Sequence, residues 1–400
     1  MTEPWSVPLD DLRRAVLDAP ADAAADVIAA WVANVVGGAA QVRLVDRAGR
    51  RLHAAGSAAA GDRAEPALDS WLCDGGPAAD ALWSGRMHRE VDDGVVRRHL
   101  PLGVRGIVEG LLTVTTERRA DDAAHDDCWH PLGELAGLLL GQASQVTDAW
   151  EVRRRSATFS VSAEFQWQLL PATSVSTPSA QLHALIEPAP RVTSDLFDWS
   201  LDGDRLWLAV LDAEGRSLSA ALPSALAVAA LRHARRSGAP VDEQVALADQ
   251  AIYDQFRGRG VVRAVVVGID LASRTAEVVR AGPPDTAPRL FRRRDGHVEE
   301  LAAPEHEDLG RFDRSPYRSV PLDVAAGDAL LIVTDGGPEA RDQHGRSFGR
   351  DALVEHFTST DPLAAVPRRL LDALREHSGG EMAQDATALV VGLGGTGARR

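Results

Sequence analysis

The spacing of apolar residues divides the first 155 positions into alternating helical and extended segments. Residues 9–34 repeat apolar side chains at about 3.6 positions, which predicts a helix ending at the glycines 37 and 38. Residues 40–46 and 51–55 read as two strands joined by a turn at 47–50. Residues 95–102 and 106–115 have the composition of buried strands. A weakly patterned stretch containing Trp71 and Trp83 separates these two pairs.

Residues 126–155 predict one long helix, whose apolar positions run from Trp129 to Trp150. Thirty helical residues would extend about 45 Å, long enough to connect two domains. An exposed apolar stripe on such a helix pairs with another helix, which predicts a signalling connector and a homodimer. The alternative is that the stripe packs on its own domain.

The second half of the chain is rich in strands. Apolar runs predict strands at 205–211, 261–270, 275–280, 289–293, 328–333 and 386–391. Helices are predicted at 219–236, with Pro223 in its first turn, and at 243–256, with Asp242 as the cap. Prolines 171, 178, 188 and 190 predict an extended approach to this region.

Three aspartates of this half lie at predicted strand ends, beside a glycine or a turn: Asp198, Asp212 and Asp335. Carboxylates at strand ends of a sandwich can converge at one rim, where hard oxygen ligands suit Mg²⁺ or Mn²⁺. The alternative is that they are solvated turn residues.

Composition narrows the classes of function. The length of 400 residues predicts two domains. The net charge of −15 makes nucleic acid an unfavourable partner. All 43 basic residues are arginine, and the absence of lysine excludes P-loop, pyridoxal Schiff-base and kinase chemistry. The two cysteines, Cys73 and Cys128, are too few for a metal cluster or a disulfide framework.

Neither a secretory signal pattern nor an apolar run of about 18 residues is found, so we expect a cytoplasmic protein with no membrane span.

The order of elements over residues 10–150 resembles a GAF sensory domain. The most similar stretch is Leu100–Leu102 followed by residues 106–115, which in that family form central strands before an exit helix. The resemblance implies an α/β sensor domain at 1–125 that takes a small ligand, whose identity stays open. His99 and His130 read as ordinary core or surface residues rather than as haem or tetrapyrrole ligands.

Residues 160–395 carry a series of motifs in a fixed order. They begin with Gln168–Pro171 and with the two acids of Thr193–Asp198. The remaining motifs are Leu211–Ala221, Arg280–Pro284, Asp335–Asp342, Ser347–Asp351 and Gln384–Thr387. This order resembles the SpoIIE/RsbU branch of the metal-dependent (PPM, type 2C) protein serine/threonine phosphatases.

The resemblance implies an α+β chain: a two-layer β-sandwich flanked by helices at 171–396, joined to the sensor by a helical linker at 126–170. The implied reaction is hydrolysis of a phosphoserine or phosphothreonine ester by a water that two Mn²⁺ or Mg²⁺ ions activate. The family's usual substrate is a phosphorylated anti-sigma-factor antagonist.

The matched positions imply roles for individual residues. Asp212 corresponds to the aspartate that bridges both ions, with the Ala213 carbonyl as a further oxygen ligand. Asp335 corresponds to a ligand of one ion, and Asp195 and Asp198 to the acids of the first motif. Gly336 lines the site, and Arg216 either binds the substrate phosphate or is a surface residue.

Several positions depart from the family pattern. Gln384 stands where the family has a ligating aspartate, and a neutral amide brings no charge to the ions. Asp385 replaces it only if the preceding loop shifts by one residue, since adjacent side chains of an extended chain point to opposite faces. Thr193 and Ser194 replace two glycines, and Pro283 replaces a histidine. These departures keep open the alternative of a catalytically dead pseudophosphatase that only binds its partner.

Overall fold

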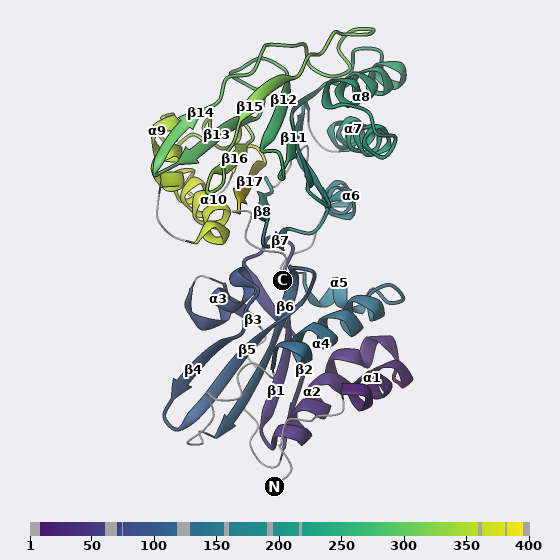
Figure 1. The fold of residues 1–400 in the computed structure, drawn as a ribbon, viewed down its shortest axis with the longest axis vertical. Helices are drawn as coiled ribbons and strands as arrows, with labels where there is room; N and C mark the ends of the chain where they lie inside the picture. Colours follow the sequence, from purple (N-terminus) through teal and green to yellow (C-terminus); the bar gives the residue numbers. More distant parts are fainter. Residues whose placement is uncertain are drawn as a thin grey trace. The chain divides into compact units, whose positions relative to one another are not determined.

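The structure is a computed structural model that describes residues 9–60, 70–73, 75–117, 129–155, 160–189, 195–215, 218–358, 362–380 and 382–394. The chain divides into two compact units, Met1–Thr158 and Phe159–Arg400 (Figure 1). Within the described ranges, no helix is long and apolar enough to cross a membrane.

The N-terminal unit is built on one antiparallel sheet with the strand order β3-β2-β1-β6-β5-β4. Both predicted strand pairs are confirmed. The strands are β1 (Ala39–Val45), β2 (Arg51–Ala59), β3 (Ser70–Leu72), β4 (His88–Asp92), β5 (Val95–Val104) and β6 (Ile107–Glu117).

Helices cover both faces of this sheet (Figure 1). One face carries α1 (Leu9–Asp18), α2 (Ala24–Val36) and α4 (His130–Ala143), which pack on alternate residues of β1, β5 and β6. The other face carries α3 (Gly76–Ser84), with a smaller core around Leu52, Leu82 and Leu111. A short helix, α5 (Ala149–Arg153), follows α4.

Two predicted helices of this unit are wrong in their extent. The helix predicted at 9–34 is interrupted at Pro20, which lacks the amide proton that helix continuation needs, and a short 3₁₀ turn (Ala21–Ala23) precedes α2. The helix predicted at 126–155 is also interrupted. The Ser144 hydroxyl donates to the Gly141 carbonyl and the Thr147 hydroxyl accepts from the Ala149 amide, so side chains satisfy the backbone groups between α4 and α5.

The apolar stripe predicted to pair with a second copy lies mostly inside the unit. Trp129, Leu132, Leu139, Leu140 and Trp150 are all buried in the main core. Leu138 and Val146 are exposed. The stripe therefore packs on its own domain, and there is no continuous connecting helix across 129–155.

The C-terminal unit is a sandwich of two antiparallel sheets, as predicted. One sheet has the order β15-β12-β11-β10-β9 and the other has the order β14-β13-β16-β17-β8-β7. The first comprises β9 (Leu196–Asp202), β10 (Arg205–Ala213), β11 (Val262–Asp270), β12 (Thr275–Ala281) and β15 (Val320–Asp323). The second comprises β7 (Ser174–Ser176), β8 (Ala180–Glu187), β13 (Arg289–Arg294), β14 (His297–Glu300), β16 (Ala329–Val333) and β17 (Ala386–Leu393).

Helices cover the outer faces of the sandwich (Figure 1). The first sheet carries α7 (Leu218–Arg236) and α8 (Val241–Phe256), and the second carries α9 (Gly349–Thr358), a 3₁₀ turn (Leu363–Ala365) and α10 (Val366–His377). The helix α6 (Val161–Leu169) opens the unit and contacts α7. Pro223 lies one turn further into α7 than predicted, and Pro240 rather than Asp242 precedes α8.

Candidate active site

The inner face of the first sheet brings two predicted site residues and one unpredicted arginine into a row. Asp212 on β10 lies directly opposite Arg263 on β11. Leu211 pairs with Leu196 of β9, which places Asp195, the residue before that strand, beside Asp212. Opposite residues of antiparallel strands share a face with Cβ atoms about 5 Å apart. The row Asp195–Asp212–Arg263 therefore faces the space between the sheets.

Arg263 joins Asp212 to a carboxylate of the second sheet. Its Nη1 lies 3.2 Å from Asp212 Oδ2 and 3.8 Å from Asp335 Oδ2. Asp335 follows β16, so acids from both sheets meet at one cation, as the strand-end argument predicted for a metal. Burial raises the pKa of Asp335, and the Arg263 charge opposes that rise.

Asp195 is buried and its carboxylate is held by hydroxyl groups. Thr334 Oγ1 donates to its Oδ2 at 2.7 Å, and Thr387 Oγ1 donates to the same oxygen at 2.8 Å. Burial raises the pKa of Asp195 well above its usual value, and the nearby charges of Asp212 and Asp385 raise it further. This carboxylate anchors both sheets to each other.

Asp385 does not replace the missing carboxylate at position 384. Its Oδ1 accepts from the Ala189 amide at 2.8 Å, and its Oδ2 lies 3.4 Å from Gln166 Nε2 and 3.5 Å from the Asp195 amide. The side chain is buried among these donors, whereas Gln384 is exposed. The one-residue shift that would exchange the two positions is not seen.

Asp198 is not part of this site, contrary to the prediction. It lies within β9 rather than at a strand end and is three residues from Asp195, so the two side chains point to opposite faces of the sheet. Its oxygens contact Arg232 at 2.7 Å and Arg235 at 3.1 Å, both on α7. Asp198 therefore fixes a helix to the outer face.

Other predicted positions have structural explanations or lie outside the description. A Cβ on Gly336 would lie 1.9 Å from the Asp385 carbonyl oxygen, so only glycine permits the loop after β16 to approach β17 this closely. Ala213 is buried at the end of β10. Arg216, Ser217, Thr193, Ser194 and Cys128 lie outside the described residues.

Arg263 and Asp308 are the site residues that sequence reasoning missed. Arg263 Nε lies 3.9 Å from Asp308 Oδ1, and Asp308 Oδ2 is bound by Arg311. A Cβ on Gly282, in the predicted Arg280–Pro284 motif, would come within 3.0 Å of both Arg263 Cγ and Asp308 Oδ1. Only the register of β10 against β11 in the structure reveals Arg263, because it sets position 263 opposite the predicted ligand Asp212.

The donor set suits one divalent cation rather than two. Asp212 and Asp335 offer hard carboxylate oxygens. The Asp195 and Asp385 carboxylates are held by the hydrogen bonds given above, and Gln384 is neutral. Over the described ranges, no group of three or more His, Cys, Asp or Glu residues is arranged to hold a metal ion. Arg263 already supplies positive charge to the two remaining acids.

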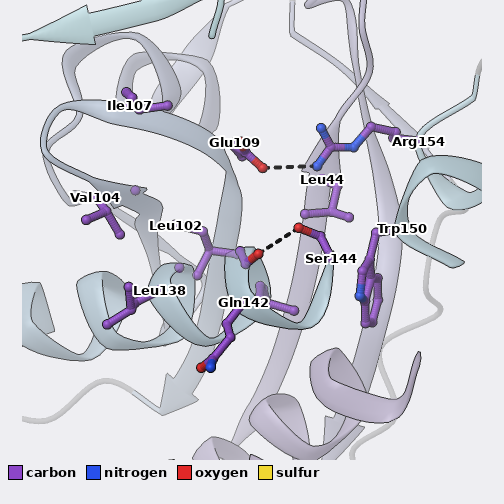
Figure 2. Close-up of a pocket in the computed structure, with 14 residues that line it drawn as sticks. Leu44, Leu102, Val104, Ile107, Glu109, Leu138, Gln142, Ser144, Trp150 and Arg154 are labelled. Carbon is purple, nitrogen blue, oxygen red and sulfur yellow. Dashed lines mark hydrogen bonds and ion pairs between the residues drawn. The ribbon is translucent and has the colours of Figure 1, made fainter. Parts of the chain in front are cut away.

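The N-terminal unit contains a separate cavity of about 560 Å³ between the sheet and α4 (Figure 2). Its walls are mostly apolar and come from β1, β5, β6, α4 and α5; they include Leu44, Leu102, Val104, Ile107, Leu140 and Trp150. An ion pair between Glu109 and Arg154, 3.3 Å apart, lies at one side. The buried Trp150 Nε1 has no hydrogen-bond partner among the described residues.

Comparisons with known proteins bear on the C-terminal unit. The family model described as Stage II sporulation protein E (SpoIIE) matches residues 202–393. No curated protein matches the sequence.

Similar solved structures cover about half of the chain. The SiaA-PP2C domain of Pseudomonas aeruginosa is 24% identical over 52% of this chain and 84% of its own, with a TM-score of 0.46. The RsbU and RsbW domains of Rv1364c from Mycobacterium tuberculosis are 26% identical over 57% and 63%, with a TM-score of 0.48. The PPM Ser-Thr phosphatase MsPP from Mycobacterium smegmatis is 22% identical over 55% and 100%, with a TM-score of 0.43.

Proposed function

We propose that the chain is a protein serine/threonine phosphatase of low intrinsic activity that uses one divalent cation, because the SpoIIE family model matches residues 202–393, where the motifs predict such a domain. The observation that carries this proposal is the convergence of Asp212 and Asp335 from the two sheets on a single positive charge. The substrate is a phosphoserine or phosphothreonine protein, and by the family resemblance a phosphorylated anti-sigma-factor antagonist.

In this proposal, each acid has a separate task. Asp212 and Asp335 hold the cation, which is Mn²⁺ or Mg²⁺; when bound, it supplies an activated water for attack on phosphorus. Asp195 holds the two sheets together through Thr334 and Thr387. Hydrolysis breaks the ester P–O bond, adds water to phosphorus and returns the proton to the serine or threonine oxygen.

A second candidate is a binding protein without chemistry, favoured by the Arg263 contacts and by Gln384. An arginine on Asp212 and Asp335 neutralises part of their charge without activating water. Such a pseudophosphatase would bind its phosphoprotein partner through the same surface and release it unchanged.

Hydrolysis of p-nitrophenyl phosphate by the full chain, titrated with Mn²⁺, separates the two candidates. A phosphatase shows turnover that is lost in Asp212→Asn and increased in Gln384→Asp, because the second change adds the missing carboxylate. Gln181→Asp adds the same charge near the far end of β17 and should leave turnover unchanged. Turnover that survives Asp212→Asn, or its absence in wild type and Gln384→Asp alike, contradicts the proposal.

We further propose that the cavity of the N-terminal unit takes a small, mostly apolar ligand with one hydrogen-bond acceptor. The supporting observations are its apolar walls and the unpartnered Trp150 Nε1. This retains the predicted sensor role, and the GAF-like identity of the unit stays a prediction.

The fluorescent probe 8-anilinonaphthalene-1-sulfonate tests the cavity in the full chain. Gly141→Leu should abolish probe binding, because a Cβ at Gly141 meets no atom within 4 Å and the added side chain has room to fill the cavity. Trp150→Phe should weaken binding while keeping the aromatic volume. Probe fluorescence that is unchanged by Gly141→Leu would place the probe elsewhere.

A further inference from the structure

Arg263 is placed between two alternative sets of acids. On one side its Nη1 contacts Asp212 at 3.2 Å and Asp335 at 3.8 Å. On the other side its Nε lies 3.9 Å from Asp308 Oδ1, beyond hydrogen-bond distance. Its side chain is 17% exposed, so the guanidinium is confined to this narrow space between acids.

In this arrangement the buried carboxylate of Asp308 does not have all of its hydrogen bonds. Asp308 is 4% exposed, and its Oδ1 has no hydrogen-bond partner among the described residues, while Oδ2 is bound by Arg311 at 3.0 Å. Arg263 Nε is likewise buried without a hydrogen-bond partner there. Buried donors and acceptors left unpaired are costly, so a small movement that closes the 3.9 Å gap is favourable in itself.

The charges on the Asp212 side make Arg263 and a divalent cation exclude each other. Arg263 brings one positive charge to Asp212 and Asp335, whereas a divalent cation brings two. A divalent cation neutralises both carboxylates, but like charges at this distance repel, so Arg263 has to leave when the cation arrives. Gly282 provides the room on the Asp308 side, since any Cβ there would crowd Arg263 and Asp308.

We propose that Arg263 is an internal competitor of the divalent cation: it occupies Asp212 and Asp335 when the cation is absent and moves to Asp308 when the cation binds. The proposal rests on the proposed function only in that the cation binds Asp212 and Asp335. It assigns Arg263 as a regulatory residue and Asp308 as its alternative partner, and it predicts a low metal affinity in a chain that is fully folded.

Mn²⁺ binding to the full chain, measured by calorimetry, tests the competition. Arg263→Gln removes the competing charge and should tighten Mn²⁺ binding by about tenfold or more. Arg205→Gln is the matched control, because it removes the same charge from the exposed far end of the same strand pair. Its effect should stay within about twofold, since exposed distant charges are screened.

Asp308→Asn tests whether Asp308 is the alternative partner of Arg263, and it should change the Mn²⁺ affinity in the opposite direction to Arg263→Gln. Without the Asp308 charge, the displaced Arg263 loses its partner, so Mn²⁺ binding should weaken. In the Arg263→Gln background the same change should have little effect, because the two residues then no longer interact. Equal effects of Asp308→Asn in both backgrounds would show that Asp308 does not receive Arg263.

Two further outcomes keep the test decisive. Unchanged Mn²⁺ affinity in a folded Arg263→Gln variant, judged by circular dichroism, overturns the proposal. If that variant fails to fold, Arg263→Lys replaces it: lysine keeps the charge but has no planar fork to span both acids, so binding should still tighten. Unchanged Mn²⁺ affinity in the lysine variant would also contradict the proposal.

Hydrolysis of p-nitrophenyl phosphate in the same samples separates this proposal from the proposed function. Tighter Mn²⁺ binding without turnover supports the competition and contradicts the phosphatase. Turnover with no change of affinity in Arg263→Gln supports the phosphatase and contradicts the competition. No Mn²⁺ binding in any variant contradicts both.

Discussion

Buried aspartates on the two faces of the first sheet differ in the number of arginines that contact them. On the outer face, one acid, Asp198, is held by two arginines of α7. At the inner face, Arg263 contacts two acids, Asp212 of this sheet and Asp335 of the other sheet. In these ion pairs arginines outnumber acids on the outer face, whereas acids outnumber arginines on the inner face.

The difference separates structural acids from the acids of the candidate site. A buried carboxylate with a full set of donors has its charge compensated and fixes two elements in place. Acids that outnumber their cations retain an affinity for further positive charge. The balance of charge around an acid, rather than its burial, therefore identifies the candidate site, because Asp198 and Asp212 are both buried.

The largest expected effect on stability lies on the outer face. Asp198→Asn leaves Arg232 and Arg235 without their counter-charge and should lower the free energy of unfolding by about 3–5 kcal/mol. Urea denaturation of the full chain measures this, with Arg235→Gln as the partner in a double-mutant cycle. A loss no larger than that of an exposed substitution would remove the distinction between the two faces.

The next largest expected effect is a pH dependence of the stability, which is due to His183 and not to either group of acids. Burial lowers the pKa of His183 to about 4, from 6.5 in the unfolded chain. The folded state then binds fewer protons than the unfolded state between these values. The free energy of unfolding should therefore fall as pH drops from 6.5 to 4, by about 3 kcal/mol. Urea denaturation at several pH values checks this, and His183→Gln should flatten the curve.

A smaller effect on stability is expected at the inner face. Asp212→Asn removes one contact of Arg263 but also one of the charges that disfavour ionisation of Asp195. These effects oppose each other, so the free energy of unfolding should change by about 1 kcal/mol or less. The same urea experiment measures it. A loss as large as that of Asp198→Asn would make Asp212 a structural residue.

The smallest effect is expected where an acid is paired but exposed. Asp323 contacts Arg292 at 2.9 Å and Arg294 at 2.8 Å, yet its side chain is 74% exposed. Exposed ion pairs contribute little because water and salt screen them. Asp323→Asn should leave the urea midpoint unchanged. A clear shift would show that the number of arginine partners, not burial and charge balance together, determines stability.

Strands and helices with a clear local apolar pattern were predictable, whereas several short or edge strands and the interruptions of helices were not. Alternating apolar residues identify a strand locally, and β1, β5, β6, β10 and β11 lie within a few residues of their predicted positions. The break between α4 and α5 depends on hydroxyl groups bonding to backbone atoms, which apolar spacing does not reveal.

The site was predictable only in part. Motif order identified Asp195, Asp212 and Asp335, which the structure brings close together. The period of two residues in a strand excludes Asp198 as a partner of Asp195, and that argument was available from the sequence. The role of Arg263 could not be predicted from the sequence, because its position opposite Asp212 depends on the register of two strands that are separated by both α7 and α8.

The side-chain amide of Gln166 connects the start of the C-terminal unit to its buried acids. It belongs to α6, the first helix after the boundary at Thr158, and its Nε2 donates both to the Asp195 carbonyl and to Asp385 Oδ2. The Asp195 carboxylate in turn accepts from Thr334 and Thr387, so one side chain of α6 is linked to both sheets of the sandwich. Gln166 therefore fixes the first helix of the C-terminal unit to the two loops that carry Asp195 and Asp385.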